Sequence, residues 1–99
     1  MNYFVYILYS DGANKFYKGQ TNNITDRVDR HNKGMEISTK HDAPWQLVWT
    51  VEQPTRSAAI LLEKKVKNLS RERLIRFMLK YSVGFANQFI KARIELLTN

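Results

Sequence analysis

Clustered hydrophobic positions predict a β-hairpin at the start of the chain. Residues 3–9 are a run of aromatic and β-branched side chains, and the same composition resumes briefly over residues 16–20. Between these runs, residues 10–14 have the composition of a turn, and Gly12 and Asn14 are residue types that tolerate a positive φ. We therefore expect two adjacent antiparallel strands joined by a tight connection.

The hydrophobic period changes after the hairpin and predicts a first helix. Ile24, Val28 and His31 are separated by four and three residues, so they fall on one face of a helix. Residues 21–23 offer capping side chains before this stretch, and Gly34 is placed to end it. A short helix with a single apolar face is expected here.

A third strand is predicted after a polar connection. Residues 35–44 show no hydrophobic period and are typical of a surface loop. Residues 45–51 are rich in strand-forming side chains. Strict alternation would place four large apolar residues on one side of the pleat: Trp45, Leu47, Trp49 and Val51.

Three helices are predicted over the rest of the chain. Residues 54–57 open the second helix of the chain, in which apolar residues recur at helical spacings up to residue 69, and Ser70 can cap a third helix over residues 71–80. Gly84 separates this helix from a last one over residues 85–97. The apolar set of the last helix is Phe89, Ile90, Ile94 and Leu97. The predicted order is β-β-α-β-α-α-α, an α+β fold in which helices flank a three-stranded antiparallel sheet, and 99 residues are expected to form one domain.

Basic residues outnumber acidic residues by 16 to 9, which gives the chain a formal net charge of +7. A charge of this size favours polyanionic partners through electrostatic attraction and counterion release. Nucleic acid is the leading candidate, and the alternatives are an anionic membrane surface and simple solubility. Charge alone does not choose among them.

Other features of the composition exclude several classes of site. The chain has no cysteine, which excludes disulfides, zinc-thiolate sites and cysteine nucleophiles, and its two histidines are too few for a histidine-rich metal cage. Neither a signal-peptide pattern at the start nor an apolar run of membrane-spanning length is present. We expect a cytoplasmic protein without a membrane-embedded part.

Two tyrosines in the predicted hairpin are the first candidates for chemistry. Tyr6 and Tyr17 lie on adjacent predicted strands, where their phenols can face one cleft. A tyrosine in a strand more often packs in the core or against a neighbouring strand. The pair alone therefore does not indicate a function.

A longer ordered set of residues makes the pattern more specific. It consists of Phe4-Val5-Tyr6, then Tyr17-Lys18-Gly19, then Arg27 and His31 in the first predicted helix, and Glu63 in the second. In this order the residues resemble the GIY-YIG endonuclease family, over about residues 3–73. The resemblance is strongest to short stand-alone proteins of that family, and it implies a GIY-YIG nuclease-like fold.

The chain departs from the family pattern at two positions. Phe4 stands where the pattern has its first glycine, and Lys18 stands between Tyr17 and Gly19, where a hydrophobic residue is usual. The Lys18 ammonium can bind a phosphate or simply face solvent, and the sequence favours neither interpretation.

The resemblance implies an active site that hydrolyses phosphodiester bonds. Its catalytic residues would be Tyr6, Tyr17, Arg27, His31 and Glu63. Glu63 would hold one divalent cation, Mg²⁺ or Mn²⁺, since hard cations prefer carboxylate oxygen. Arg27 would stabilise charge on the phosphate, and one of the two tyrosines would accept a proton from the attacking water. His31 would orient that tyrosine or relay the proton.

Spacing by itself allows a simpler role for two of these residues. Arg27 lies at the border of the apolar face of its helix, where it can extend into solvent or pair with an aspartate of the same helix. Glu63 has Lys67 one turn further on and can form an ordinary surface ion pair with it. The resemblance, rather than the spacing, favours the catalytic roles.

The expected function is therefore a metal-dependent DNA endonuclease acting on branched or single-stranded DNA in repair or recombination, with a protein partner as one means of targeting. Residues beside the site are expected to contact the nucleic acid: Lys18, Gly19, Arg30, Lys40, Lys64 and Lys67. The alternatives are a nucleic-acid-binding module without turnover and a structural or protein-interaction domain.

Overall fold

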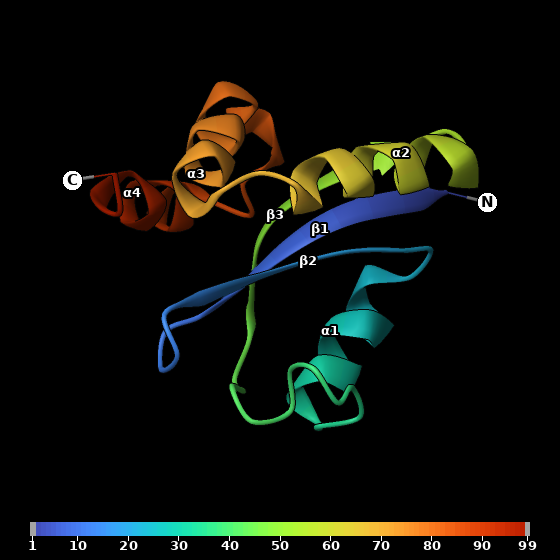
Figure 1. The fold of residues 1–99 in the computed structure, drawn as a ribbon, viewed down its shortest axis with the longest axis horizontal. Helices are drawn as coiled ribbons and strands as arrows, with labels where there is room; N and C mark the ends of the chain where they lie inside the picture. The colour runs from blue at the N-terminus through green and yellow to red at the C-terminus, as the bar shows by residue number, and fades with distance from the viewer. Residues whose placement is uncertain (1, 99) are drawn as a thin grey trace.

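Three strands form one antiparallel sheet, as the sequence predicts. In a computed structural model that describes residues 2–98, the strands are β1 (Tyr3–Ser10), β2 (Lys15–Thr21) and β3 (Gln46–Gln53). Their order is β2-β1-β3, which puts β1 in the centre and leaves β2 and β3 at the edges (Figure 1). In the β1–β2 turn, Asn14 has a φ of 54°, in the left-handed region that Asn tolerates.

The helices also follow the predicted order. They are α1 (Ile24–Asn32), α2 (Arg56–Lys67), α3 (Arg71–Lys80) and α4 (Gln88–Leu96), and a short 3₁₀ turn, η1 (Ser82–Gly84), precedes α4. Each α-helix begins at a side chain that accepts a hydrogen bond from a backbone N–H of its first turn. These capping residues are Asn23, Thr55, Ser70 and Asn87. Over residues 2–98, no helix combines the length and the apolar character needed to span a membrane.

Helices cover both faces of the sheet, with α1 on one side and α2, α3 and α4 on the other (Figure 1). Successive side chains of a strand point to opposite faces, so β1 contributes to two separate clusters. Val5, Ile7 and Tyr9 pack with residues of α2, α3 and α4, whereas Tyr6 and Leu8 pack with residues of α1. The central strand is therefore buried from both sides.

A β-bulge in β3 changes the predicted facing of its large side chains. The pairing with β1 shifts its register between Leu47 and Trp49, and Val48 is the extra residue. As a result Trp45 and Leu47 pack on the α1 side of the sheet, while Trp49 and Val51 pack on the α2 side. The prediction that these four apolar residues share one face is wrong, because strict alternation holds only in a strand without a bulge.

The last helix begins later than the hydrophobic pattern predicts. Phe85 forms an isolated β-bridge with Trp49 beside β3, and Asn87 caps α4. Within α4, Ile90 is buried but Phe89 is 83% exposed. The predicted apolar set therefore loses Phe89, because adjacent helix positions differ in direction by about 100° and only one of the two can face the core.

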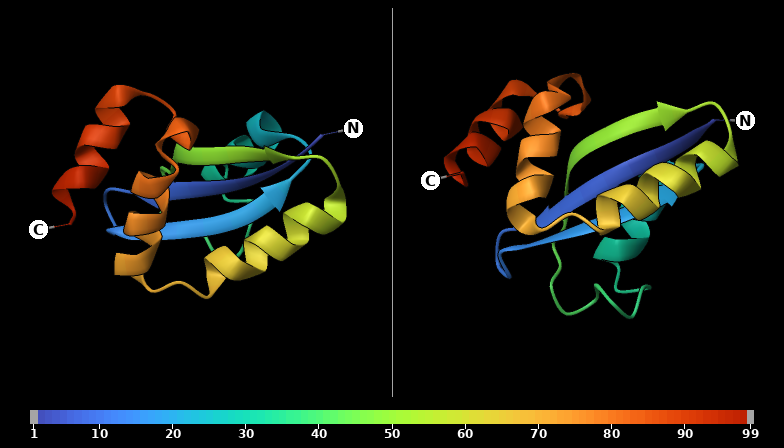
Figure 2. Two further views of the ribbon diagram at one scale, coloured as in Figure 1. Left: turned by 90° about the horizontal axis from the view of Figure 1, so that it is seen from above. Right: turned by 45° about the horizontal axis from the view of Figure 1, so that its top comes forward.

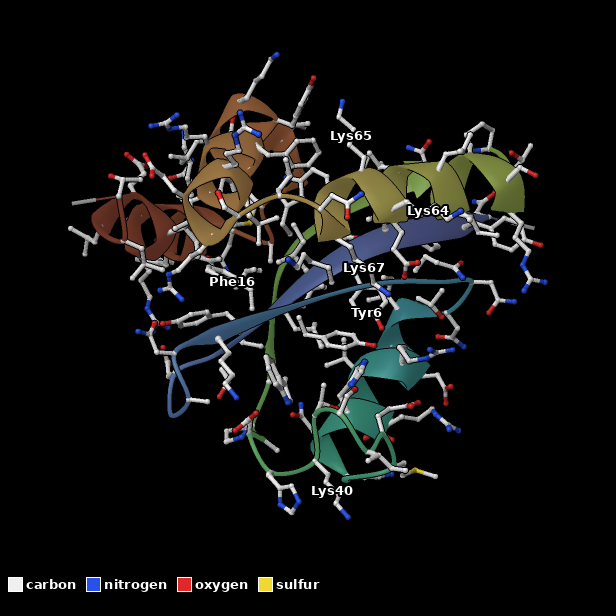
Figure 3. All side chains as sticks on the ribbon, viewed as in Figure 1. Tyr6, Phe16, Lys40, Lys64, Lys65 and Lys67 are labelled. Carbon is white, nitrogen blue, oxygen red and sulfur yellow. The ribbon has the colours of Figure 1, made fainter. Side chains whose placement is uncertain are left out.

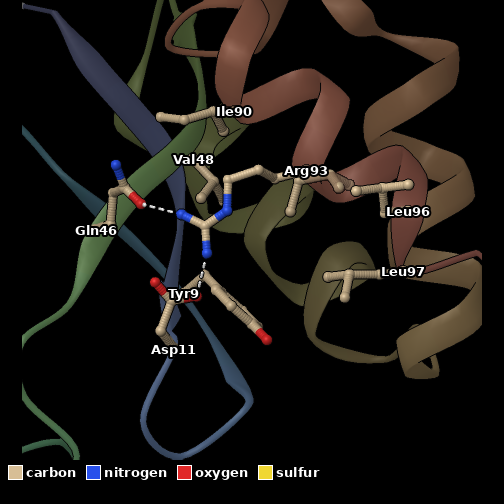
Figure 4. Close-up of a pocket in the computed structure, with 9 residues that line it drawn as sticks. Tyr9, Asp11, Gln46, Val48, Ile90, Arg93, Leu96 and Leu97 are labelled. Carbon is tan, nitrogen blue, oxygen red and sulfur yellow. Dashed lines mark hydrogen bonds and ion pairs between the residues drawn. The ribbon is translucent and has the colours of Figure 1, made fainter.

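An exposed ion pair links α4 to the end of the sheet. The Arg93 guanidinium pairs with Asp11 in the β1–β2 turn and lies 3.5 Å from the side-chain oxygen of Gln46 (Figure 4). Figure 2 shows that α3 and α4 gather at this end of the molecule, whereas α2 runs along β2 toward the other end. The β2 edge is thus flanked by α1 on one face of the sheet and by α2 on the other.

Candidate active site

The phenol of Tyr6 lies against the backbone of the neighbouring strand. Tyr6 of β1 is paired with Gly19 of β2 and is only 1% exposed. A Cβ atom at position 19 would stand 2.6 Å from the Tyr6 hydroxyl oxygen, which is too close for any side chain. Close approach therefore explains why a glycine follows Tyr17-Lys18 in β2, and Gly19 itself is buried.

A buried chain of hydrogen bonds runs from this phenol to the loop after α1. The Tyr6 hydroxyl lies 3.0 Å from Nε2 of His31, and Nδ1 of the same ring lies 2.8 Å from Oγ1 of Thr39. The Thr39 hydroxyl donates to the backbone carbonyl of Glu36 at 3.4 Å. His31 and Thr39 are 0% and 1% exposed, so bulk water does not compete for these bonds.

The Glu36 carbonyl is the last acceptor of this series of hydrogen bonds, and it fixes the direction of the others. A carbonyl oxygen can only accept a hydrogen bond, so the Thr39 hydroxyl donates its hydrogen to the Glu36 carbonyl. The same hydroxyl must then accept a hydrogen bond from Nδ1–H of His31. When the ring is neutral, Nε2 carries no proton and accepts the hydroxyl hydrogen of Tyr6. In this tautomer the free lone pair of the imidazole is aimed at the phenol.

Burial favours the uncharged forms of Tyr6 and His31, in agreement with this hydrogen-bond network. It raises the pKa of Tyr6 well above the ordinary tyrosine value, and the neighbouring Tyr17 phenol adds to the rise, while the Arg27 guanidinium opposes it. Burial also lowers the pKa of His31, although the carboxylate of Glu36 acts against that change. At neutral pH Tyr6 thus keeps its proton and His31 is uncharged.

Tyr17 completes the aromatic cluster. Its ring centroid lies 4.7 Å from that of His31 and 6.3 Å from that of Tyr6. Trp45 meets the Tyr17 ring edge-on, with 6.3 Å between the centroids. Tyr17 is half-buried, whereas Tyr6 and His31 are almost fully buried. Of the two predicted tyrosines, Tyr17 is therefore the more exposed.

Three supporting residues of this cluster were not singled out by the sequence analysis as parts of the site. Thr39 orients the His31 ring, and Trp45 donates its ring N–H to the Thr39 carbonyl at 2.9 Å. Asn32, at the end of α1, donates to the backbone carbonyl of Trp45 at 3.0 Å. Thr39 lies in a loop without a hydrophobic period, so no sequence signal distinguishes it from the exposed polar residues beside it.

Arg27 lies in α1 close to the Tyr6 phenol, and its charge opposes part of the rise that burial causes in the Tyr6 pKa. Its Nε is buried and has no hydrogen-bond partner among residues 2–98. Pairing with an aspartate of the same helix, the simpler role that spacing allowed, is not found in this part of the chain, and Asp29 pairs with Lys33 at 2.8 Å instead. Because a buried donor without an acceptor is costly, Arg27 is suited to receive an anion.

Glu63 stands apart from the aromatic cluster. It belongs to α2, on the other side of the sheet from α1, and within the described residues no hydrogen bond or ion pair joins it to the other predicted catalytic residues. Its side chain is 18% exposed, and Oε2 lies 3.7 Å from Nζ of Lys67. The ion pair that spacing alone allowed is therefore present, as a long and partly solvated contact that holds Glu63 weakly.

A divalent cation at Glu63 would need further ligands from water and substrate. Residues 2–98 contain no group of three or more His, Cys, Asp or Glu side chains that could hold a metal ion together. Mg²⁺ commonly binds through one or two carboxylates, keeps several waters and takes substrate phosphates as further ligands. A single carboxylate fits that chemistry, and it does not fit a closed structural metal site such as that of zinc.

The basic residues predicted to contact nucleic acid fall into two groups. Lys64 and Lys67 lie on α2 (Figure 3), and Lys18 of β2 is close enough to Lys67 for the two charges to interact. Burial, reinforced by the charge of Lys67, lowers the pKa of Lys18. Arg30 is already paired with an acidic residue at 3.3 Å, and Lys40 lies in the loop after α1, away from α2 (Figure 3). The structure thus brings Lys18 and Lys67 together, and Arg30 and Lys40 lie elsewhere.

Comparisons with known proteins give one consistent result. Residues 2–76 match the model of the GIY-YIG catalytic domain. UPF0213 proteins from Pediococcus pentosaceus and Staphylococcus aureus are 31% and 33% identical to this chain over 88 and 79 residues, covering 88% and 78% of it and 93% and 94% of those proteins. The solution NMR structure of a UPF0213 protein from Bacillus halodurans is similar with a TM-score of 0.54 and 29% identity, over 93% of this chain and 94% of that one.

Proposed function

The chain belongs to the GIY-YIG family of nucleases, and from this membership we propose that it is a metal-dependent endonuclease that hydrolyses phosphodiester bonds in DNA. The observation that carries the proposal is the buried hydrogen-bond chain from Tyr6 through His31 to Thr39, with Tyr17 and Arg27 beside it. Phosphodiester hydrolysis by water needs a proton acceptor next to a group that binds the phosphate, and Tyr17 and Arg27 are our candidates for these two roles.

We propose that Tyr17, as its phenolate, accepts the proton of the attacking water. Burial raises the pKa of Tyr6 and keeps its proton on the hydrogen bond to His31, so Tyr6 is the phenol that stays neutral. Tyr17 is the more exposed of the two, and its ring packs against the imidazole. Neighbouring titratable groups in unlike environments commonly divide their roles in this way. Tyr6 and His31 would then form the fixed surface on which Tyr17 is positioned.

Arg27 would bind the phosphate that is cleaved. Its guanidinium can donate to the non-bridging oxygens, where negative charge grows in the transition state. The missing partner of its buried Nε supports this role, because a guanidinium with a fixed acidic partner would have fewer donors for a substrate.

Glu63 would hold the divalent cation, Mg²⁺ or Mn²⁺. When bound, such a cation stabilises the charge on the phosphate and on the leaving oxygen. Glu63 would leave its long contact with Lys67, and the Lys67 ammonium would stay at the β2 edge as a contact for the DNA backbone. Lys18 and Lys64 would contribute to the same basic surface.

Branched or single-stranded DNA from repair or recombination is the proposed substrate form. Assays on plasmid, branched and single-stranded DNA with Mg²⁺ or Mn²⁺ test the activity, and chelation by EDTA should stop it. Glu63→Ala and Arg27→Ala should each lower the cleavage rate by a factor on the order of 10² to 10³. Glu63→Ala should retain DNA binding, whereas Arg27→Ala should also weaken it, because it removes a phosphate contact. Glu52→Ala, at an exposed glutamate of β3, is the matched control and should cleave like wild type.

Two outcomes of these assays would contradict parts of the proposal. If wild type binds all three forms of DNA and cleaves none of them with either metal, the chain is a nucleic-acid-binding module without turnover. Cleavage that survives Glu63→Ala unchanged would overturn the metal assignment alone.

A further inference from the structure

A polar hollow of about 200 Å³ lies where the end of β2 meets the beginnings of α1 and α2. Its lining residues are Tyr3, Gln20, Thr21, Asn22, Arg27 and Arg56. Two of these carry a guanidinium, and the lining includes no acidic residue. We call it the Arg56 hollow, and its chemistry is that of a site for an oxyanion.

The arginines of this hollow differ from most others in the chain. Among residues 2–98, four of the seven arginines have side-chain partners, namely Arg30 with Glu36, Arg71 with Asn14, Arg76 with Glu72 and Arg93 with Asp11. In the same part of the chain, Arg27, Arg56 and the exposed Arg73 form no ion pair, and the buried Nε of Arg27 has no hydrogen-bond partner. Two guanidinium groups lining one hollow repel each other, and a bound anion would remove that repulsion.

The position of Arg56 relates the hollow to the reaction centre. Arg27 lines the hollow and also lies beside the Tyr6 phenol, so the two sites share one side chain. Arg56 is the first residue of α2, where the helix dipole adds partial positive charge. Arg56, Glu63 and Lys67 are seven and four residues apart, so they lie on one stripe of α2 that extends about 16 Å.

From these observations we propose that the Arg56 hollow binds a backbone phosphate of the nucleic-acid strand, next to the phosphate that is cleaved. Arg56 would hold this neighbouring phosphate with its fork of N–H donors, while Arg27 contacts the cleaved one. The strand would continue past Glu63 toward Lys67 along the β2 edge. This inference rests on the nucleic-acid-binding part of the proposed function and does not require turnover.

Binding measured without cleavage tests the proposal directly. In EDTA, the affinity for a labelled single-stranded oligonucleotide is measured across a range of salt concentrations for wild type, Arg56→Gln, Arg56→Lys and Arg73→Gln. Arg73 is the matched control, since it is an exposed arginine on α3 that does not line the hollow. Thermal unfolding of each variant confirms that it is folded.

Arg56→Gln should weaken binding roughly tenfold and lower the slope of log K against log salt by about 0.7, the value for one phosphate contact on a single strand. Arg56→Lys should restore the slope but only part of the affinity, because an ammonium lacks the bidentate fork. Arg73→Gln removes the same charge and should change the affinity and the salt slope much less.

Three results would overturn the proposal. The first is an equal effect of Arg56→Gln and Arg73→Gln, and the second is no effect of Arg56→Gln. In the third, inorganic phosphate shifts the Nε–H resonances of Arg27 and Arg56 while oligonucleotide affinity does not depend on Arg56, which would make the hollow a site for free anions. Failure of the nuclease proposal is distinguishable, because it would abolish cleavage and leave the Arg56 effect on binding intact.

Discussion

The missing side chain at Gly19 allows the Tyr6 phenol to lie against β2. Gly19→Ala would place a Cβ atom 2.6 Å from the phenolic oxygen, and neither the ring nor the strand can move freely in the buried cluster. We expect a loss of about 1–3 kcal/mol in the free energy of unfolding, measured with urea, because overpacking a buried contact costs this much.

Gly12 offers the matched control for this substitution. A Cβ atom at Gly12 would have no neighbour within 4 Å, so Gly12→Ala should leave the stability near that of wild type. Equal losses for the two variants would show that the cost arises from the backbone of glycine in general and not from the Tyr6 contact.

The buried His31 ring predicts a pH dependence of stability. Burial lowers its pKa in the folded state below the value of about 6.5 in the unfolded chain. As the pH falls below about 6.5, the unfolded chain takes up a proton that the folded ring resists, so the free energy of unfolding should fall toward acid, by at most about 1.4 kcal/mol per pH unit from this group.

Urea unfolding at about pH 7.5 and about pH 5.5 measures this dependence. His31→Gln should reduce the difference between the two conditions, whereas His41→Gln, at an exposed histidine, should keep the difference seen in wild type. If the two variants lose the same amount of pH dependence, the neutral buried imidazole is the wrong description of His31.

At the scale of elements, the sequence predicts what depends on local chemistry. The first helix was predictable because Ile24, Val28 and His31 share a face and Asn23 can cap it, and these residues have those places in the structure. The bulge at Val48 was not predictable, since it depends on pairing with β1. The role of the Thr39 hydroxyl was not predictable either, because it depends on the folded loop that brings Thr39 to His31.

The packing of α4 gives a prediction for one element. Ile94 is buried against the sheet and α3, whereas Phe89 of the same helix is 83% exposed. Ile94→Ala should lower the free energy of unfolding by about 2–5 kcal/mol, and Phe89→Ala should change it by less than about 0.5 kcal/mol, although it removes the larger side chain. Similar losses in urea unfolding would contradict the orientation of α4.

At the scale of the whole molecule, the charge is divided unevenly along the chain. Residues 1–55 contain six basic and six acidic residues, whereas residues 56–99 contain ten basic and three acidic residues. The net charge of +7 therefore comes from the second part, to which α2, α3 and α4 belong, while the aromatic cluster lies in the neutral first part. A nucleic acid would be attracted mainly to the helices and positioned over the cluster from there.

This division predicts which lysines matter for DNA binding. Replacing Lys64 and Lys67 on α2 together by Gln should weaken binding and lower the salt slope by about 2. Replacing Lys15 and Lys33 together removes the same charge, but these two lysines lie in the neutral first part of the chain and not on α2, so the slope should change little. Equal changes in the titrations would mean that only the total charge matters.

The single-turnover rate of DNA cleavage by Tyr17→Phe tests whether Tyr17 is the general base. The substitution removes the hydroxyl of Tyr17 and keeps the ring against His31. We expect the rate to fall by at least about 10², the usual contribution of a general base, while Tyr81→Phe, at an exposed tyrosine after α3, cleaves like wild type. A Tyr17→Phe variant that cleaves DNA at the wild-type rate would contradict the account.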